Sequence, residues 1–195
     1  HLNINSILSK IDELRMIAKN SKATIIGITE SKLDDTVLDG ELEIDGYELV
    51  RSDRNRHGGG VACFVKNDIS FNVRTNFTTE IENIFLDILL PKTKPILVGI
   101  LYRPPDQSKF LEKLTLAIAN TENFDNQEVY ILGDININLI NKERHIPNGI
   151  KNYREFCSLH GLNQLITSPT RVTVNTLSLL DHILTNSSDK VPSPG

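Results

Sequence analysis

The 195-residue chain has the length of one domain, and its 39% hydrophobic and 24% charged residues are typical of a globular protein rather than a disordered one. No apolar run approaches the roughly 20 residues that a membrane-spanning helix requires. The formal net charge of −4 argues against a protein that coats nucleic acid nonspecifically. It leaves room for a nuclease whose basic residues are placed locally.

The two cysteines, Cys63 and Cys157, lie far apart and lack the spacing of metal ligands. We expect buried free thiols and an intracellular, reducing compartment. The chain opens on His-Leu-Asn and closes on Val-Pro-Ser-Pro-Gly. We therefore expect residues 1–195 to form a single domain that is incomplete at both termini.

The first half of the chain alternates apolar and polar residues in patterns that predict one helix and several strands. Residues 2–5 are predicted to end a strand, and apolar residues from Ile7 to Ile17 predict a helix with Ser6 as N-cap and an end near Asn20. Residues 51–60 form a basic turn that contains three glycines. Strands are predicted over residues 23–29, 47–52, 61–66, 70–74, 84–90 and 95–103.

In the second half, residues 108–120 and 148–160 have the apolar spacing of helices, and Gly161 is a typical C-cap for the second. A buried strand is predicted over residues 129–132, a brief apolar segment over 162–166 and a closing strand over 177–185. Strands in hairpins that alternate with a few helices indicate two sheets packed face to face with helices outside.

Separate predicted strands end on, or carry, polar side chains that are suited to catalysis: Glu30, Tyr102, Asp134 with Asn136, and Asp181. Residues two apart on an extended chain project to the same face, so we expect Asp134 and Asn136 to lie side by side at a strand end. The alternative is that this segment is only a turn, because Gly, Asp and Asn are common turn formers.

Together with Asn3, these residues supply what metal-assisted phosphodiester hydrolysis requires. The oxygens of Glu30 and of the Asn3 amide suit Mg²⁺, or alternatively Mn²⁺, since such ions prefer hard oxygen ligands. Asp134 is suited to taking a proton from an attacking water that Asn136 orients. The Tyr102 hydroxyl is suited to donating a hydrogen bond to a phosphate oxygen.

Each candidate also has a structural interpretation. Glu30 could pair with Lys32 or Arg103, Asp181 could be a turn or salt-bridge acid, and Tyr102 could simply pack. Arg103 could order either the site or the loop after it. The basic turn is typical of a solvated loop, although beside a nuclease groove it could contact phosphates; its members are Arg51, Arg54, Arg56 and His57.

A set of short motifs occurs in order along the chain: NINS at residues 3–6, TESKL at 29–33, GGGVA at 58–62, LYRP at 101–104, GDIN at 133–136, SPT at 168–170 and LDHIL at 180–184. This ordered set resembles the endonuclease/exonuclease/phosphatase superfamily, and it is most similar to the apurinic-endonuclease-like domain of non-LTR (LINE-type) retrotransposons. The resemblance implies a four-layer α/β sandwich. It also implies a Mg²⁺-dependent nuclease that acts in the nucleus and nicks one DNA strand. The 3′-hydroxyl at the nick would prime reverse transcription by the reverse transcriptase domain of the same polyprotein.

The resemblance implies a role for each candidate residue. Glu30 resembles the metal ligand, helped by Asn3, and Tyr102 the phosphate contact. Asp134 with Asn136 resembles the water-positioning pair, and Asp181 an aspartate beside the site. The candidate substrate contacts are Asn3, Arg103, Thr170 and Arg54.

The family's catalytic histidine lies in a later Ser-Asp-His segment, which residues 1–195 do not contain. Strand alternation turns His182 away from Asp181, which favours a structural or surface histidine. The remaining histidines, His1, His57, His145 and His160, offer no convincing substitute. We expect part of a central strand and one late strand to be absent, and nicking to be slower than in a longer chain.

Two other functions are compatible with the sequence. One is an inactive or domesticated nuclease fold that serves as a binding module for nucleic acid or protein. The other is a phosphatase or phosphodiesterase of the same superfamily that acts on inositol lipids or sphingomyelin. The retroelement-like wording of the YRPP and LDHIL motifs argues against the second.

Overall fold

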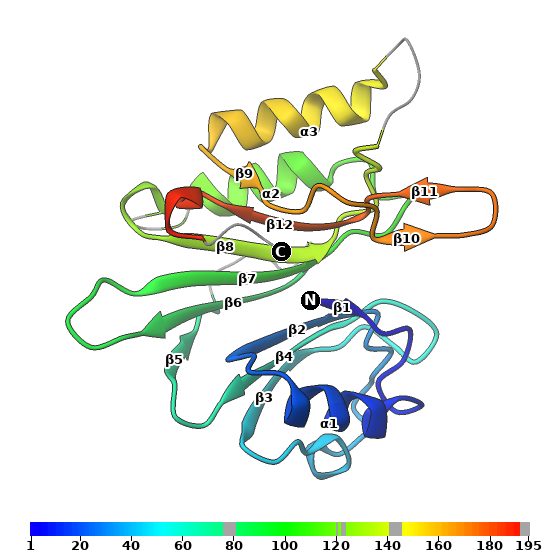
Figure 1. The fold of residues 1–195 in the computed structure, drawn as a ribbon, viewed down its shortest axis with the longest axis vertical. Coiled ribbons are helices and arrows are strands. Elements are labelled where there is room, and N and C mark those ends of the chain that lie inside the picture. Colours follow the sequence, from blue (N-terminus) through cyan, green and yellow to red (C-terminus); the bar gives the residue numbers. More distant parts are fainter. Residues whose placement is uncertain (76–80, 120, 122–123, 141–145, 192–195) are drawn as a thin grey trace.

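Two β-sheets pack face to face in the computed structural model, with helices on both outer faces (Figure 1). The structure describes residues 1–75, 81–119, 121, 124–140 and 146–191. This arrangement confirms the predicted four-layer α/β sandwich with two mainly antiparallel sheets. Within the described residues, no helix is long and apolar enough to cross a membrane.

The first sheet has the strand order β1-β2-β4-β3, and helix α1 covers its outer face (Figure 1). β1 and β2 run parallel, whereas the other neighbours are antiparallel. The elements are β1 (Leu2–Asn3), α1 (Ile11–Asn20), β2 (Ile25–Thr29), β3 (Tyr47–Ser52) and β4 (Val61–Lys66).

The second sheet has the order β5-β6-β7-β8-β12-β9, in which β7 and β8 are the parallel pair. Helices α2 and α3 cover its outer face, and the small hairpin β10–β11 projects from one end (Figure 1). The elements are β5 (Ser70–Val73), β6 (Glu82–Leu89), β7 (Ile96–Tyr102), α2 (Phe110–Ala119), β8 (Val129–Asp134), α3 (Asn148–Leu159), β9 (Asn163–Gln164), β10 (Arg171–Val172), β11 (Leu177–Ser178) and β12 (Asp181–Thr185). The short 3₁₀ segments are Asp39–Leu42, Phe124–Asn126 and Ser188–Lys190.

The apolar residues form three buried layers that alternate with the sheets and helices. One layer lies between α1 and the first sheet, a second between the two sheets, and a third under α2 and α3. Cys63 is buried between the sheets and Cys157 is half-buried on α3, and both are free thiols, as predicted. The packing of these layers fixes the positions of β2, β7, β8 and β12 relative to one another.

The first helix begins at Ile11, so the predicted start at Ser6 is wrong. Ser6 has a φ of 90°, and its N–H donates to the Glu30 carbonyl at 2.8 Å. The N–H of Ile7 likewise donates to the Ser31 carbonyl at 3.0 Å, and the Ile7 side chain is buried. Tertiary hydrogen bonds therefore outcompete the local cap. They also hold the segment after β1 against the segment after β2.

The predicted closing strand over residues 177–185 is two strands, β11 and β12. Thr170 Oγ1 accepts the N–H groups of Leu180 and Asp181, both at 3.1 Å, and Asn138 Oδ1 accepts that of Leu179 at 3.0 Å. These side chains satisfy backbone groups that a continuous ladder would have used. The chain therefore turns here, and β12 begins at Asp181.

Candidate active site

Residues from both sheets meet where β1, β2, β7, β8 and β12 place the predicted polar side chains. Asp134 is the register partner of Tyr102 on β7 and of Asp181 on β12, and Asn3 is that of Thr29 on β2. Glu30 follows β2 directly. The structure thus brings together residues that lie up to 178 positions apart in sequence, from Asn3 to Asp181.

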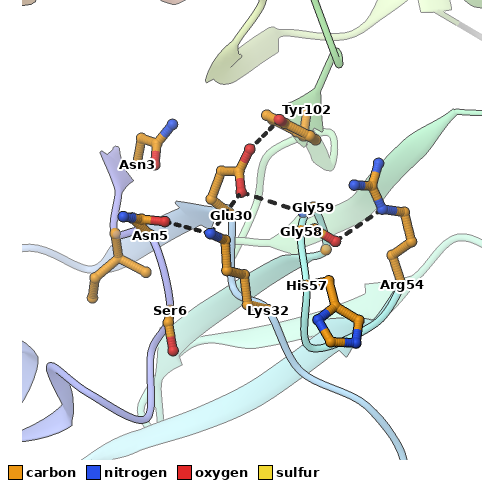
Figure 2. Close-up of polar contacts among 12 residues, drawn as sticks. Asn3, Asn5, Ser6, Glu30, Lys32, Arg54, His57, Gly58, Gly59 and Tyr102 are labelled. Carbon is orange, nitrogen blue, oxygen red and sulfur yellow. Dashed lines mark hydrogen bonds and ion pairs between the residues drawn. The ribbon is translucent and has the colours of Figure 1, made fainter.

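The Glu30 carboxylate lies at the centre of a hydrogen-bond network that Figure 2 shows. It accepts hydrogen bonds from the Tyr102 hydroxyl and from the Gly59 N–H, the latter at 3.3 Å. Lys32 Nζ lies 3.9 Å from the same carboxylate and donates to Asn5 Oδ1 at 2.5 Å. Burial and the Glu30 carboxylate raise the pKa of Tyr102, so its hydroxyl remains a donor at neutral pH.

Asp134 is 5% exposed, and both of its oxygens accept hydrogen bonds. Oδ2 accepts from the Asn3 side-chain amide at 2.7 Å, and Oδ1 from the Asn136 backbone N–H at 3.1 Å. Burial, with smaller contributions from the carboxylates of Asp181 and Glu30, raises the pKa of Asp134 to about 6 against the opposing hydrogen bonds from Asn3 and Asn136. Asp134 is therefore more basic than an ordinary aspartate.

The predicted side-by-side arrangement of Asp134 and Asn136 on an extended strand is wrong. β8 ends at Asp134, and Asn136 has a left-handed φ of 51°. The Asn136 amide donates to the Arg103 carbonyl at 2.9 Å, while the Arg103 guanidinium donates to the carbonyls of Ile135 and Asn136, both at 3.3 Å. The turn interpretation describes the local backbone, and Arg103 orders this turn and, through Gln107, the loop after it.

Asp181 faces the same cleft. Its Oδ1 has no hydrogen-bond partner among the described residues and lies 3.4 Å from Nδ1 of His1. The other His1 nitrogen, Nε2, lies 3.1 Å from Thr29 Oγ1, and the His1 side chain is 3% exposed. His1 therefore lies inside the site rather than in a frayed end, which sequence reasoning missed because the contact depends on β12.

The His182 side chain is buried in the core, although the residue also lines the edge of the cleft. It is 1% exposed, and its Nδ1 lies 2.6 Å from the Tyr153 hydroxyl on α3. Burial lowers the pKa of His182 to about 4, so the ring is neutral at physiological pH. This placement agrees with the structural role expected from strand alternation. Of the other histidines, His57 is exposed in the basic turn, the His160 ring packs at a tilt against Phe156, and His145 lies outside the described residues.

A cleft of about 700 Å³ connects these residues. Its lining includes three carboxylates, Glu30, Asp134 and Asp181, and two cations, Lys32 and Arg171. Thr170 lines it as well, although its hydroxyl also anchors the start of β12. A cleft that combines acidic groups with flanking cations suits a phosphate together with a metal ion.

Glu30 and Asn3 fit a divalent cation of the magnesium type. Among the described residues, no three His, Cys, Asp or Glu side chains form a metal cluster, so a closed site of the zinc type does not fit. Mg²⁺ keeps several waters and needs only one or two carboxylates. Glu30 and the Asn3 amide both line the cleft, where the carboxylate of Asp181 adds negative charge.

The predicted DNA contact Arg54 already has protein partners. Its Nε donates to the Gly58 carbonyl at 2.8 Å (Figure 2), and its Nη1 pairs with Glu82 at 2.8 Å. Its contact with DNA remains a prediction, as do the contacts of Arg103 and Thr170. Sequence reasoning considered Lys32 only as a possible partner of Glu30, and it gave no role to Glu82. The available signal for Glu82 was a carboxylate at the start of the strand that pairs with Tyr102.

The packed sheets define an α/β-sandwich protein with a carboxylate-lined cleft at its strand ends. The chain belongs to the endonuclease/exonuclease/phosphatase family, whose sequence profile matches residues 1–195. This match confirms the resemblance that the ordered motifs indicate. None of the curated proteins compared with the chain matches it in sequence.

Solved structures share the fold. The endonuclease domain of TRAS1, a telomere-specific non-LTR retrotransposon, superposes with a TM-score of 0.70 at 16% identity, over 94% of this chain and 82% of that one. An AP endonuclease from Archaeoglobus fulgidus gives 0.73 at 20% identity, over 95% and 85%. The 3′ phosphatase NExo from Neisseria, bound to a product DNA hairpin, gives 0.65 at 16% identity, over 95% and 85%.

Proposed function

We propose that the protein is a Mg²⁺-dependent DNA endonuclease that nicks one strand and leaves a 3′-hydroxyl. The observation that carries this proposal is the convergence of Glu30, Asp134 and Asp181 on one cleft, where the Tyr102 hydroxyl binds Glu30. The likeness to the TRAS1 endonuclease domain and to an AP endonuclease supports DNA as the substrate over an inositol lipid or sphingomyelin.

Asp134 is the proposed general base. With a pKa of about 6 it is mainly ionised at neutral pH, yet it accepts a proton more readily than an ordinary aspartate. Water attacks the phosphorus and forms a new bond to it, its proton passes to Asp134, and the bond from phosphorus to the 3′-oxygen breaks. The departing 3′-oxygen takes a proton from solvent to become the 3′-hydroxyl, and the phosphate stays on the 5′ side of the nick. The hydrogen bonds from Asn3 and from the Asn136 backbone hold the carboxylate in one orientation during this transfer.

Tyr102 is the proposed hydrogen-bond donor to a phosphate oxygen, in exchange for the bond that its single hydroxyl proton makes to Glu30 in this structure. Its hydroxyl stays protonated because burial and Glu30 raise its pKa, and negative charge that develops on the phosphate strengthens such a bond. Lys32 and Arg171 line the same cleft and provide positive charge for the DNA backbone. Donor and cations together offset the repulsion between the phosphate and the carboxylates of the cleft.

Glu30 and Asn3 are the proposed ligands of Mg²⁺, with Mn²⁺ as an alternative ion. When bound, such an ion supplies Lewis-acid stabilisation of charge on the phosphate. The similarity to a retrotransposon endonuclease domain also supports two wider proposals, a parent polyprotein with a reverse transcriptase domain and action in the nucleus.

Plasmid nicking tests the proposal. Wild type should convert supercoiled to open-circular plasmid with Mg²⁺ but not with EDTA, and Asp134→Ala should lose this activity. Asp87→Ala is the control, because it removes a carboxylate on β6 that pairs with Arg74 away from the cleft. DNA binding without nicking would instead support a binding module. Turnover of a phosphoinositide or sphingomyelin with intact plasmid would support the phosphatase alternative.

A further inference from the structure

Glu82 joins the two sheets beside the candidate metal ligand. It is the first residue of β6 in the second sheet and the register partner of Tyr102 on β7. Its carboxylate nevertheless contacts the first sheet, where Oε2 accepts the Gly60 N–H at 2.5 Å and Oε1 pairs with Arg54 at 2.8 Å. The side chain is 18% exposed, so both contacts are largely shielded from water.

Both partners of Glu82 belong to the segment that contains the glycine loop, defined here as residues 58–60. Arg54 Nε donates to the Gly58 carbonyl, so the ion pair fixes one end of the loop while the Gly60 N–H bond fixes the other. The residue between them, Gly59, is left with its N–H directed at Glu30 (Figure 2). The loop's own conformation is thus set from the opposite sheet.

The packing around the loop leaves no room for side chains. A Cβ on Gly59 would lie 2.4 Å from Glu82 Oε2, and one on Gly60 would lie 2.4 Å from Ser31 Oγ. Both glycines have positive φ, 70° and 81°, which side-chain-bearing residues rarely adopt. The carbonyls of Gly59 and Gly60 accept the N–H groups of Lys32 and Ser31 at 3.0 and 3.2 Å. The loop is therefore bound to the residues that directly follow Glu30.

We propose that Glu82, together with Arg54, is a positioning residue that orients the Glu30 carboxylate through the glycine loop. Glu30 itself has a left-handed φ of 56°, a conformation that costs a non-glycine residue free energy and that surrounding contacts have to maintain. The Glu82–Arg54 pair lies outside the cleft and holds the glycine loop, whose Gly59 N–H in turn binds the Glu30 carboxylate. This assigns Arg54 a place in the architecture of the site rather than on the DNA. The inference rests on the proposed metal-dependent nuclease function.

The test compares three variants with a matched control. Glu82→Ala removes both contacts of Glu82, and Glu82→Gln keeps an oxygen that can accept the Gly60 N–H. Arg54→Ala removes the ion pair and the bond to the Gly58 carbonyl but keeps the bond between Glu82 and Gly60. Asp87→Ala is the control. Asp87 lies on β6 as Glu82 does, and it also pairs with an arginine, Arg74, but this pair lies away from the loop. Thermal unfolding of each variant establishes that it is folded.

The first readout needs neither metal nor substrate. Amide hydrogen exchange of Gly59 and Gly60 in the metal-free protein should accelerate at least tenfold in Glu82→Ala and less in Glu82→Gln. Asp87→Ala should leave the exchange of these two amides unchanged. Unchanged exchange in a folded Glu82→Ala protein would overturn the inference, whatever the protein's activity proves to be.

The second readout is the affinity for Mn²⁺, measured from the electron paramagnetic resonance signal of the free ion. Removal of an outer partner of a metal ligand typically weakens metal binding 10- to 100-fold. We expect a loss in this range for Glu82→Ala and partial rescue by Glu82→Gln. The double variant Glu82→Ala/Arg54→Ala should lose less than the sum of the two single losses, because the two side chains act as a pair. Wild-type affinity in Glu82→Ala would overturn the inference.

The third readout separates positioning from DNA contact. In Glu82→Ala and Arg54→Ala, plasmid nicking should fall at low Mg²⁺ and recover at high Mg²⁺, with the KM for DNA unchanged. A raised KM for DNA in Arg54→Ala, with normal exchange of Gly60, would overturn the inference in favour of a phosphate contact. A wild type that neither binds Mn²⁺ nor nicks DNA would refute the proposed function instead, and the exchange measurement alone would then decide the role of Glu82.

Discussion

The side-chain amide of Asn3 donates a 2.7 Å hydrogen bond to Oδ2 of Asp134, and this bond joins β1 of the first sheet to β8 of the second. A donor on the ionised carboxylate stabilises the charged form. Asn3 therefore limits how far burial raises the pKa of Asp134.

Asn3→Ala should raise the pKa of Asp134 further above its present value of about 6. The midpoint is measured by NMR titration of the Asp134 carboxyl carbon in metal-free protein. Asn5→Ala is the control, because the Asn5 side chain accepts a bond from Lys32 and is not the residue that donates to Asp134. An unchanged midpoint in Asn3→Ala would contradict the proposed coupling between these two residues.

Asp134→Asn should abolish nicking and stabilise the protein at neutral pH. The pKa of Asp134 is raised from 3.8 to about 6 on folding, so the folded state holds the proton more tightly, and stability is lost as the pH rises between these values. The difference corresponds to about 3 kcal/mol. Urea unfolding in EDTA should show a gain of up to about this size at pH 7.5 and almost none at pH 4.

Asp87→Asn is the control for that measurement. It breaks a pair in which Arg74 donates two 2.7 Å bonds to the carboxylate, so it should destabilise the protein at pH 7.5. A loss of stability in Asp134→Asn at the same pH would show that burial of the ionised Asp134 carboxylate does not destabilise the folded protein.

Tyr102→Phe should lower kcat about 10²-fold and leave the KM for DNA nearly unchanged, because one donor to the developing charge is lost while the ring still packs. Steady-state nicking kinetics measure both quantities. Tyr130→Phe is the matched control, because its hydroxyl donates to Glu128 near the opposite end of β8. Equal losses in the two variants would argue against a catalytic hydroxyl on Tyr102.

His182→Gln should retain nicking at neutral pH and change the acid stability of the protein. The pKa of His182 is lowered from 6.5 to about 4 on folding, so the unfolded state binds the proton more tightly and wild type loses stability as the pH falls between these values. The loss is up to about 3 kcal/mol. Urea unfolding from pH 7 to pH 4 should show a flatter profile in the variant.

The control for this experiment is His57→Gln, which changes an exposed histidine in the basic turn. Its unfolding profile should match that of wild type. Loss of nicking in a folded His182→Gln protein, with normal activity in His57→Gln, would show that His182 acts in catalysis.

Sequence patterns predicted those features that depend on short-range order. Glu30 and Asp134 were predicted as site residues because each is a carboxylate at the end of a buried apolar strand. A charge is costly to bury, so such a position indicates solvent or a charged partner. The two sheets follow from the spacing of strands and turns. These signals are contained within ten or so residues of chain, so one sequence suffices to detect them.

The features that sequence reasoning missed all depend on contacts between distant segments. Ser6 fails as a cap because its N–H bonds to the Glu30 carbonyl, and Asn136 leaves the extended conformation because Arg103 binds its carbonyl. The role of Glu82 is visible only when β6 is placed against the glycine loop. No local pattern encodes such partners.

The two sheets use separate parts of the chain: β1 to β4 lie within residues 2–66, and β5 to β12 within residues 70–185. Scission of the backbone between Lys66 and Ser70 would leave each fragment with all the strands of its own sheet. Glu30 and Asn3 would belong to one fragment, and Asp134 and Asp181 to the other. Enzymatic turnover by the mixed fragments would then report their reassembly, which makes this fold a candidate split reporter.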